Sequence, residues 1–181
     1  MTIVSIQPEQ VATSPSAARI SLKPLKAFTE HPGMVNGAWW PQSRDLAVEL
    51  PPLVAALDKA WGRINRVTVN LHMWPQIPRK VPTGSHVIRV GWYDAEQDPH
   101  DVCLISYSHA PYRWDLLVIP PETDPERAAH LMATASDVHN MQTASALIAD
   151  AAEPPRDPSP DPVRILIHPA EGTPDRPGIP V

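Results

Sequence analysis

The sequence predicts an α+β fold, with a mainly antiparallel sheet of about five strands, two helices on one face, and disordered proline-rich termini. Five short segments have the alternating or apolar pattern of strands, and two longer segments place apolar residues at helical spacing. Many of the 24 prolines lie at the termini and in loops. Of 181 residues, 43% are hydrophobic and 19% are charged, which is enough to form one core.

The expected strands are short and follow one another closely. Pro24 should end the first strand, because proline cannot donate to a ladder. The second has strict period two, with Val67 and Val69 on one face and Thr68 on the other. Short connections between the last four strands favour an antiparallel meander. The five strands are expected at residues 19–24, 63–74, 86–92, 102–107 and 113–119.

Two helices are expected, at residues 43–61 and from Thr123 onward. The first has one apolar stripe and should end at Gly62. Pro51 and Pro52 interrupt it, which predicts a kink or two short helices. The second starts at Thr123-Asp-Pro-Glu126, which has the pattern of a capping box with an early proline.

The pattern divides the chain into four parts. Residues 1–18 are expected to be a disordered tail, residues 19–136 the α+β domain, and residues 137–152 a weak helical extension. Residues 153–181 form a proline-rich, disordered tail. Within that tail, residues 163–168 resemble a lone strand, which either pairs with a sheet edge or is a docking peptide.

Composition narrows the classes of function. A net charge of −5 and a pI near 5.9 argue against a domain that binds duplex nucleic acid, and a nucleic-acid partner is not the leading expectation. No apolar run is long enough for a membrane span and no secretion signal is visible, so a cytoplasmic protein is expected. The single cysteine, Cys103, is expected to be a small buried hydrophobe. No cofactor is predicted, because the chain has no glycine-rich phosphate loop.

The stretch from Gly33 to Leu46 is the best candidate for a binding site, because it holds adjacent tryptophans, Trp39 and Trp40. One ring should close the core and the other should line a pocket or interface, where tryptophan is enriched. Ser43 is expected to cap the following helix. The predicted binding residues are Trp39, Trp40, Ser43, Arg44, Asp45, Trp74 and Arg79; no catalytic residue and no metal ligand is predicted.

Other polar groups allow weaker hypotheses. His72 and His86 could be neighbours on adjacent strands, but two histidines alone make a weak zinc site. Asp115, in an otherwise apolar strand, should pair with Arg89 or Arg113. A group of basic residues could form an anion-binding face, although the solvated side of the sheet is the preferred interpretation; these are Arg63, Arg66, Arg79, Lys80 and Arg89.

Three segments together resemble a family of uncharacterised proteins from high-GC bacteria, known as a domain of unknown function. They are Gly37-Ala-Trp-Trp-Pro-Gln-Ser-Arg-Asp-Leu-Ala47, Trp61-Gly-Arg-Ile-Asn-Arg-Val-Thr-Val-Asn70 and Trp114-Asp-Leu-Leu-Val-Ile-Pro-Pro-Glu-Thr123. The first contains the signature Gly-Ala-Trp-Trp-Pro-x-Ser. The similarity covers Arg19 to Ser136, and the resemblance implies no activity.

Three functions are compatible with these features. The leading hypothesis is a small cytoplasmic binding or regulatory module, not an enzyme, that uses the Trp-Trp loop to bind an unknown protein or small molecule. An enzyme with a nearby cleft could instead use Asp45, His100, Asp101 or Asp115 as acid or base. A weaker alternative is a binder of single-stranded nucleic acid, which would stack on Trp39, Trp74 or Trp92 beside Arg79 and Lys80.

Overall fold

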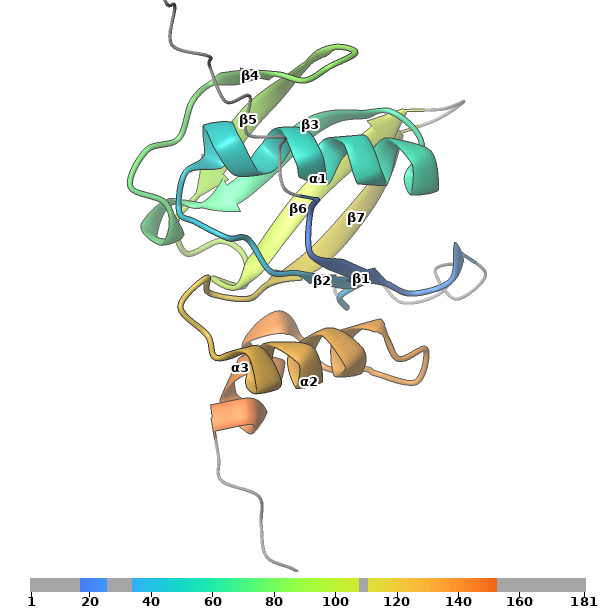
Figure 1. The fold of residues 1–181 in the computed structure, drawn as a ribbon, viewed down its shortest axis with the longest axis vertical. Helices are drawn as coiled ribbons and strands as arrows, with labels where there is room; N and C mark the ends of the chain where they lie inside the picture. Colours follow the sequence, from blue (N-terminus) through green and yellow to red (C-terminus); the bar gives the residue numbers. More distant parts are fainter. Residues whose placement is uncertain (1–16, 26–33, 108–110, 153–181) are drawn as a thin grey trace, which may run out of the picture.

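The computed structural model describes residues 17–25, 34–107 and 111–152. Three α-helices and one mixed sheet make up this part of the chain (Figure 1). The helices are α1 (Leu46–Trp61), α2 (Pro125–Ser136) and α3 (Ala144–Ala152), with a 3-10 turn, η2, at Leu71–Met73. The strands are β1 (Ile20–Leu22), β2 (Gly37–Trp39), β3 (Ile64–Asn70), β4 (Lys80–Pro82), β5 (Val87–Tyr93), β6 (Asp101–Tyr107) and β7 (Pro111–Val118).

The sheet has seven strands in the order β1-β2-β7-β6-β3-β5-β4, so the prediction of five mainly antiparallel strands is wrong. β2 pairs with β7 in parallel, and β3 pairs with β5 in parallel. The two extra strands, β2 and β4, have three residues each, which is too short to show a period. The meander fails because β6 pairs with β3 and β7, while β4 occupies the edge beside β5.

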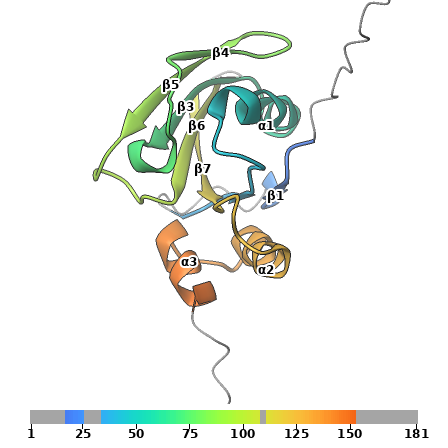
Figure 2. The same cartoon turned by 60° about the vertical axis from the view of Figure 1, so that its left-hand side comes forward.

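Helices cover both faces of the sheet, so the prediction that they share one face is also wrong. Alternate residues of a strand point to opposite faces. Trp39, Leu116 and Val118 pack in a core with α1, whereas Ala38 and Leu117 pack with α2 and α3 in a second core. Figures 1 and 2 show α2 and α3 beside β1 and β2, well away from β4 and β5.

The first helix is a single helix that contains both Pro51 and Pro52, so neither proline divides it. Leu50, Leu53, Leu57 and the other residues of its inner stripe are fully buried against the sheet. This burial offsets the two backbone hydrogen bonds that the prolines cannot make.

Three capping residues set the limits of these helices. Gly62 is the C-cap of α1, as expected, but Asp45, not Ser43, is its N-cap and accepts from the backbone N–H of Ala47. Asp124, not Thr123, caps α2 in the same way.

The backbones of β1 and β2 approach so closely at position 37 that only glycine fits there. Gly37 opens β2, directly opposite Leu22 of β1. Its φ is +152°, and a Cβ placed there would stand 2.2 Å from the carbonyl oxygen of Ser21. Any larger residue would therefore separate β1 from β2.

Two stacked tryptophan pairs fill the core under α1. Trp39 stacks on Trp74 with ring centroids 5.5 Å apart, and Trp61 stacks on Trp114 at 4.5 Å. The hydroxyl of Ser106 accepts a hydrogen bond from the indole nitrogen of Trp114. Aromatic packing of this kind adds to the burial energy of each ring. Of the two predicted tails, residues 1–16 and 153–181, including residues 163–168, lie outside the described residues, whereas Ala18 packs against the α1 core.

Candidate functional site

Polar residues gather at one end of the sheet, where several strands have their carboxyl ends. Strands β2, β3, β5 and β7 all run in the same direction, so their carboxyl ends meet there beside the start of β6. The connection 94–100, between β5 and β6, crosses this end of the sheet. Gln97, in that connection, lines a pocket on each side of it.

The larger cavity, here called the strand-end pocket, has a volume of about 510 Å³. Arg44 reaches it from the Trp-Trp stretch and donates to the Met73 carbonyl at 2.8 Å and to Glu122 at 2.7 Å. On its rim, Nε2 of His72 lies 2.6 Å from the carboxylate of Asp94, within hydrogen-bond distance. The lining residues are Arg44, Asn70, His72, Met73, Asp94, Ala95, Gln97, Pro99, His100 and Pro120.

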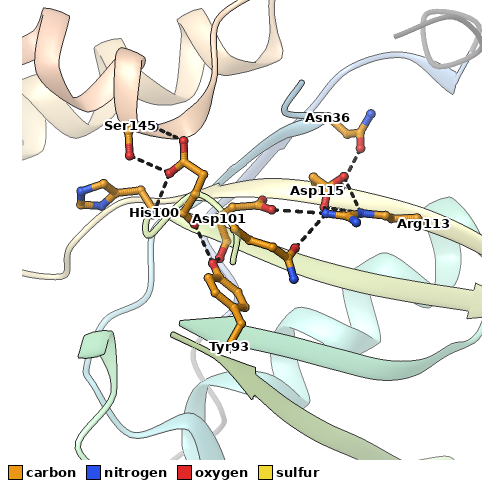
Figure 3. A network of polar contacts seen from close by, with 9 residues as sticks. Asn36, Tyr93, His100, Asp101, Arg113, Asp115 and Ser145 are labelled. Carbon is orange, nitrogen blue, oxygen red and sulfur yellow. Dashed lines mark hydrogen bonds and ion pairs between the residues drawn. The ribbon is translucent and has the colours of Figure 1, made fainter. Parts of the chain in front are cut away.

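The smaller cavity, here called the acidic pocket, has a volume of about 300 Å³ and lies beside the start of α3. Asp101 and Asp115 meet there on adjacent strands, and both are buried (Figure 3). Arg113 donates to Asp115 at 2.9 Å and stands 3.9 Å from Asp101. The lining residues are Val35, Glu96, Gln97, Asp98, Asp101, Arg113, Asp115, Thr143 and Ala144.

The two carboxyl groups differ in their surroundings. Burial and the neighbouring Asp115 raise the pKa of Asp101 to about 8, and Arg113 only partly opposes this. One carboxyl oxygen of Asp101, Oδ1, is buried without a hydrogen-bond partner among the described residues. Asp115 instead holds Arg113 through both of its oxygens. The pair therefore combines a protonated acid with an ion-paired carboxylate near neutral pH.

Asp98 joins the acidic pocket to α3. Its carboxylate accepts from the backbone N–H and the hydroxyl of Ser145, at 2.8 and 2.7 Å, and from the N–H of His100 at 2.9 Å. Burial opposes the charge of Asp98, but these hydrogen bonds outweigh it and lower its pKa. Burial also lowers the pKa of His100, so its ring is neutral near pH 7. The hydroxyl of Tyr93 donates to the carbonyls of Asp98 and Asp101.

Cys103 lies on the same face, directly opposite Asp115. Burial and the nearby carboxylate raise the pKa of its thiol to about 12. A thiol with such a pKa is protonated at neutral pH and is not an activated nucleophile. Cys103 is buried, as the sequence predicts.

The predicted binding residues do not lie together in the structure. Trp39 and Trp74 are core residues that stack on each other. Trp40 is half-buried beneath the guanidinium of Arg19, 3.5 Å above its ring. Arg79 stands 5.2 Å from the ring of Trp92, remote in sequence from the Trp-Trp stretch.

The three polar residues of that stretch have separate roles. Ser43 donates to the buried Glu49 at 2.8 Å and so ties the loop to α1. Asp45 caps the helix. Of all the predicted binding residues, Arg44 alone lines either of these two pockets.

Two hypotheses from the sequence have clear outcomes. The expected ion pair between Asp115 and Arg113 is confirmed. The expected closeness of His72 and His86 is wrong, because His72 follows the carboxyl end of β3 and His86 precedes the amino end of the parallel strand β5. The pairing of Asp101 with Asp115 depends on register, although an aspartate inside an apolar strand is a signal that a sequence can show.

Comparison with known proteins identifies the family. A family model described as a family of unknown function, DUF5994, matches residues 19–135. The chain belongs to DUF5994. The match includes both Asp101 and Asp115 and ends before α3, so Ser145 lies outside the DUF5994 region. No curated protein and no solved structure matches the chain.

Membership of DUF5994 leaves the site to be interpreted from its chemistry. The described helices include none with the length and apolar character of a membrane span. Within the described ranges, no three histidine, cysteine, aspartate or glutamate side chains are arranged to hold a metal ion.

Proposed function

We propose that the protein is a small cytoplasmic, non-enzymatic binding module that takes a small organic molecule into the strand-end pocket. The position of this pocket carries the proposal, because segments from four parts of the chain converge there, at the carboxyl ends of parallel strands. Ligands of open α/β sheets bind outside the carboxyl ends of strands. A volume of about 510 Å³ is within the usual range for such ligands.

The Trp-Trp stretch supports this pocket indirectly. Trp39 stacks on Trp74, which directly follows Met73 in the pocket wall. Arg44, from the same stretch, fixes the carbonyl of Met73 by a hydrogen bond. The tryptophans thus hold the wall in place and the ligand meets Arg44 and Met73. We also propose that Gly-Ala-Trp-Trp-Pro-x-Ser is a signature of the family and that its members come from high-GC bacteria.

The lining indicates the chemistry of the ligand. Met73, Ala95, Pro99 and Pro120 supply apolar surface. The hydrogen-bonding groups of Arg44 are engaged with Glu122 and Met73. A compact, largely apolar molecule with one polar group fits this lining better than a highly charged one.

A substitution that fills the pocket tests the proposal. Ala95 is exposed and lines the pocket, so Ala95→Phe should occupy it without disturbing the core. Ala55→Phe is a matched control, because Ala55 is exposed on α1 outside both pockets. Ligand-observed NMR with a fragment library should find compounds that bind the wild type and Ala55→Phe but not Ala95→Phe. Compounds that bind all three proteins alike, or none that bind, would contradict the proposal.

The acid pair favours a second candidate, an enzyme that uses general acid–base chemistry. Two carboxyl groups with different surroundings in one pocket are a common arrangement for this chemistry. In this proposal Asp101 is the acid and Asp115 is the carboxylate, positioned by Arg113. Hydrolysis of a panel of nitrophenyl esters, phosphates and glycosides should then be measurable and lost in Asp101→Asn. The absence of any activity that depends on Asp101 would exclude this candidate for those substrates.

A further inference from the structure

A row of cationic side chains crosses the sheet on the face opposite α1. The backbone register aligns Lys80 of β4 with Arg89 of β5, and Arg89 with Arg66 of β3. Arg66 lies opposite Ile105 of β6, which lies opposite Arg113 of β7. Four of the five positions in this row are therefore cations, here called the cationic row: Lys80, Arg89, Arg66 and Arg113.

The cationic row points to solvent. The residues next to its members in sequence point the other way, into the α1 core; they are Val67, Val81, Ile88, Val90 and Trp114. All four cations are exposed, because α2 and α3 pack near β1, β2 and β7 and leave the far half of this face open (Figures 1 and 2). The row is thus a solvated surface on a rigid sheet.

Three of the four members of the row lack compensating acids. Arg113 is paired with Asp115, but within the described part of the chain no carboxylate pairs with Lys80, Arg89 or Arg66. Neighbouring strands lie about 4.8 Å apart, and like charges directly opposite each other destabilise a sheet. Three adjacent cations are therefore a cost to the folded protein that a bound anion would remove.

The surface beside the cationic row can accept an extended polymer that carries flat aromatic groups. On one side lies Tyr107, two residues beyond Ile105 on β6 and 52% exposed. On the other side Gly91 aligns with Thr68, and the guanidinium of Arg66 reaches over it, 3.7 Å from where a Cβ at Gly91 would lie. An exposed aromatic ring thus flanks four charges that span about 19 Å, taken as four strand spacings.

We propose that the open face of the sheet binds single-stranded nucleic acid, with the cationic row on successive phosphates and Tyr107 stacked on a base. Binding without sequence preference needs a positive track for the backbone and an aromatic platform for the bases, and this face supplies both. The net charge of −5 does not oppose it, because charges beyond a Debye length of about 8 Å are screened at physiological ionic strength. This surface is separate from the strand-end pocket.

Fluorescence anisotropy with a labelled fifteen-nucleotide oligo(dT) tests the site. Log affinity should fall with log salt concentration with a slope of about −2, since each phosphate contact on a single strand contributes about 0.7 and Arg113 is already paired with Asp115. Arg66→Gln combined with Arg89→Gln should weaken binding at least about tenfold and bring the slope to about −0.7. Lys59→Glu, at an exposed position of α1, lowers the net charge by the same two units away from the row and should leave both values near wild type.

Two further arms separate nucleic acid from other polyanions. Tyr107→Ala should weaken oligo(dT) binding at least about fivefold, because stacking of one base on an aromatic ring contributes at least that much. The same variant should bind inorganic polyphosphate as the wild type does. Thermal unfolding checks that each variant is folded. Equal losses in the Arg66→Gln/Arg89→Gln double variant and in Lys59→Glu, no effect of Tyr107→Ala, or no binding by the folded wild type would overturn the proposal.

Discussion

Asp101 should make the stability of this protein fall as pH rises, and Asp101→Asn should abolish that fall. The carboxyl group is 6% exposed, and burial beside Asp115 raises its pKa to about 8 from an ordinary 3.8. An acid whose pKa is raised on folding holds its proton in the folded state after the unfolded state has lost it. Between about pH 4 and pH 8 the folded state therefore binds more protons, and the free energy of unfolding decreases with rising pH.

The size of the effect follows from linkage. A group that is fully protonated in the folded state and fully ionised in the unfolded state costs about 1.4 kcal/mol for each pH unit. From pH 5 to pH 7 Asp101 alone should remove about 3 kcal/mol of stability, a large part of what a domain of this size possesses. Below pH 4 and above pH 8 its contribution should be constant.

The measurement is urea unfolding, followed by circular dichroism from pH 4 to pH 9. Asparagine is nearly isosteric, carries no charge and offers an N–H donor to Asp115, as the protonated acid does. The difference in unfolding free energy between Asp101→Asn and wild type should grow with pH and become constant above pH 8. Glu126→Gln, an exposed change in the first turn of α2, is the control and should show no such growth.

Two outcomes would refute this reasoning. A constant difference at every pH would mean that Asp101 titrates alike in the folded and unfolded states. A difference that grows in the opposite direction would mean that Arg113, 3.9 Å away, stabilises an ionised Asp101 more than burial opposes it.

Three other changes test the packing described above. Trp39→Ala should lower the free energy of unfolding by about 3–5 kcal/mol, because it empties a fully buried site in the α1 core. Trp92→Ala, at a ring that is 45% exposed, should lower this free energy far less. Denaturant unfolding measures both changes. Gly37→Ala should cost at least about 1–3 kcal/mol from backbone strain, and amide exchange should increase in β1, whereas unchanged exchange would contradict the close approach. Asp124→Ala should cost about 1 kcal/mol in thermal unfolding through loss of the α2 cap, and no change would argue against that cap.

The stronger local signals in the sequence predict what they should. The apolar stripe of residues 46–61 corresponds to α1. The strand predicted over residues 63–74 is β3 only as far as Asn70, because Asn70 accepts from the N–H of His72 and a 3-10 turn follows at Leu71–Met73. The side chains that can cap a helix predict the first residue of each helix less well. Ser43, Asp45, Thr123 and Asp124 are all good caps, and which of two neighbours serves depends on how the preceding loop enters the helix.

The site was harder to predict because its parts are distant in sequence. Trp39 and Trp40 look alike in the sequence, but neighbouring side chains of β2 point to opposite faces of the sheet. Trp39 therefore packs in the α1 core, and Trp40 lies on the other side, beneath Arg19. Asp101 and Asp115 are both visible as acids at or within strands. Their meeting required the β6–β7 register, which places Cys103 opposite Asp115 and Asp101 one step along the same face.

By itself the sequence determined which segments form the longer strands and helices, since hydrophobic periodicity is a property of one segment and its own neighbours. It also determined that Cys103 and at least one tryptophan of the Trp-Trp pair are buried. Only the tertiary structure decided the strand order, the use of both sheet faces by helices, and the alignment of Lys80, Arg89 and Arg66 in one row. The physical reason is that pairing between strands depends on contacts remote in sequence, and a shift of one residue would move every side chain to the other face.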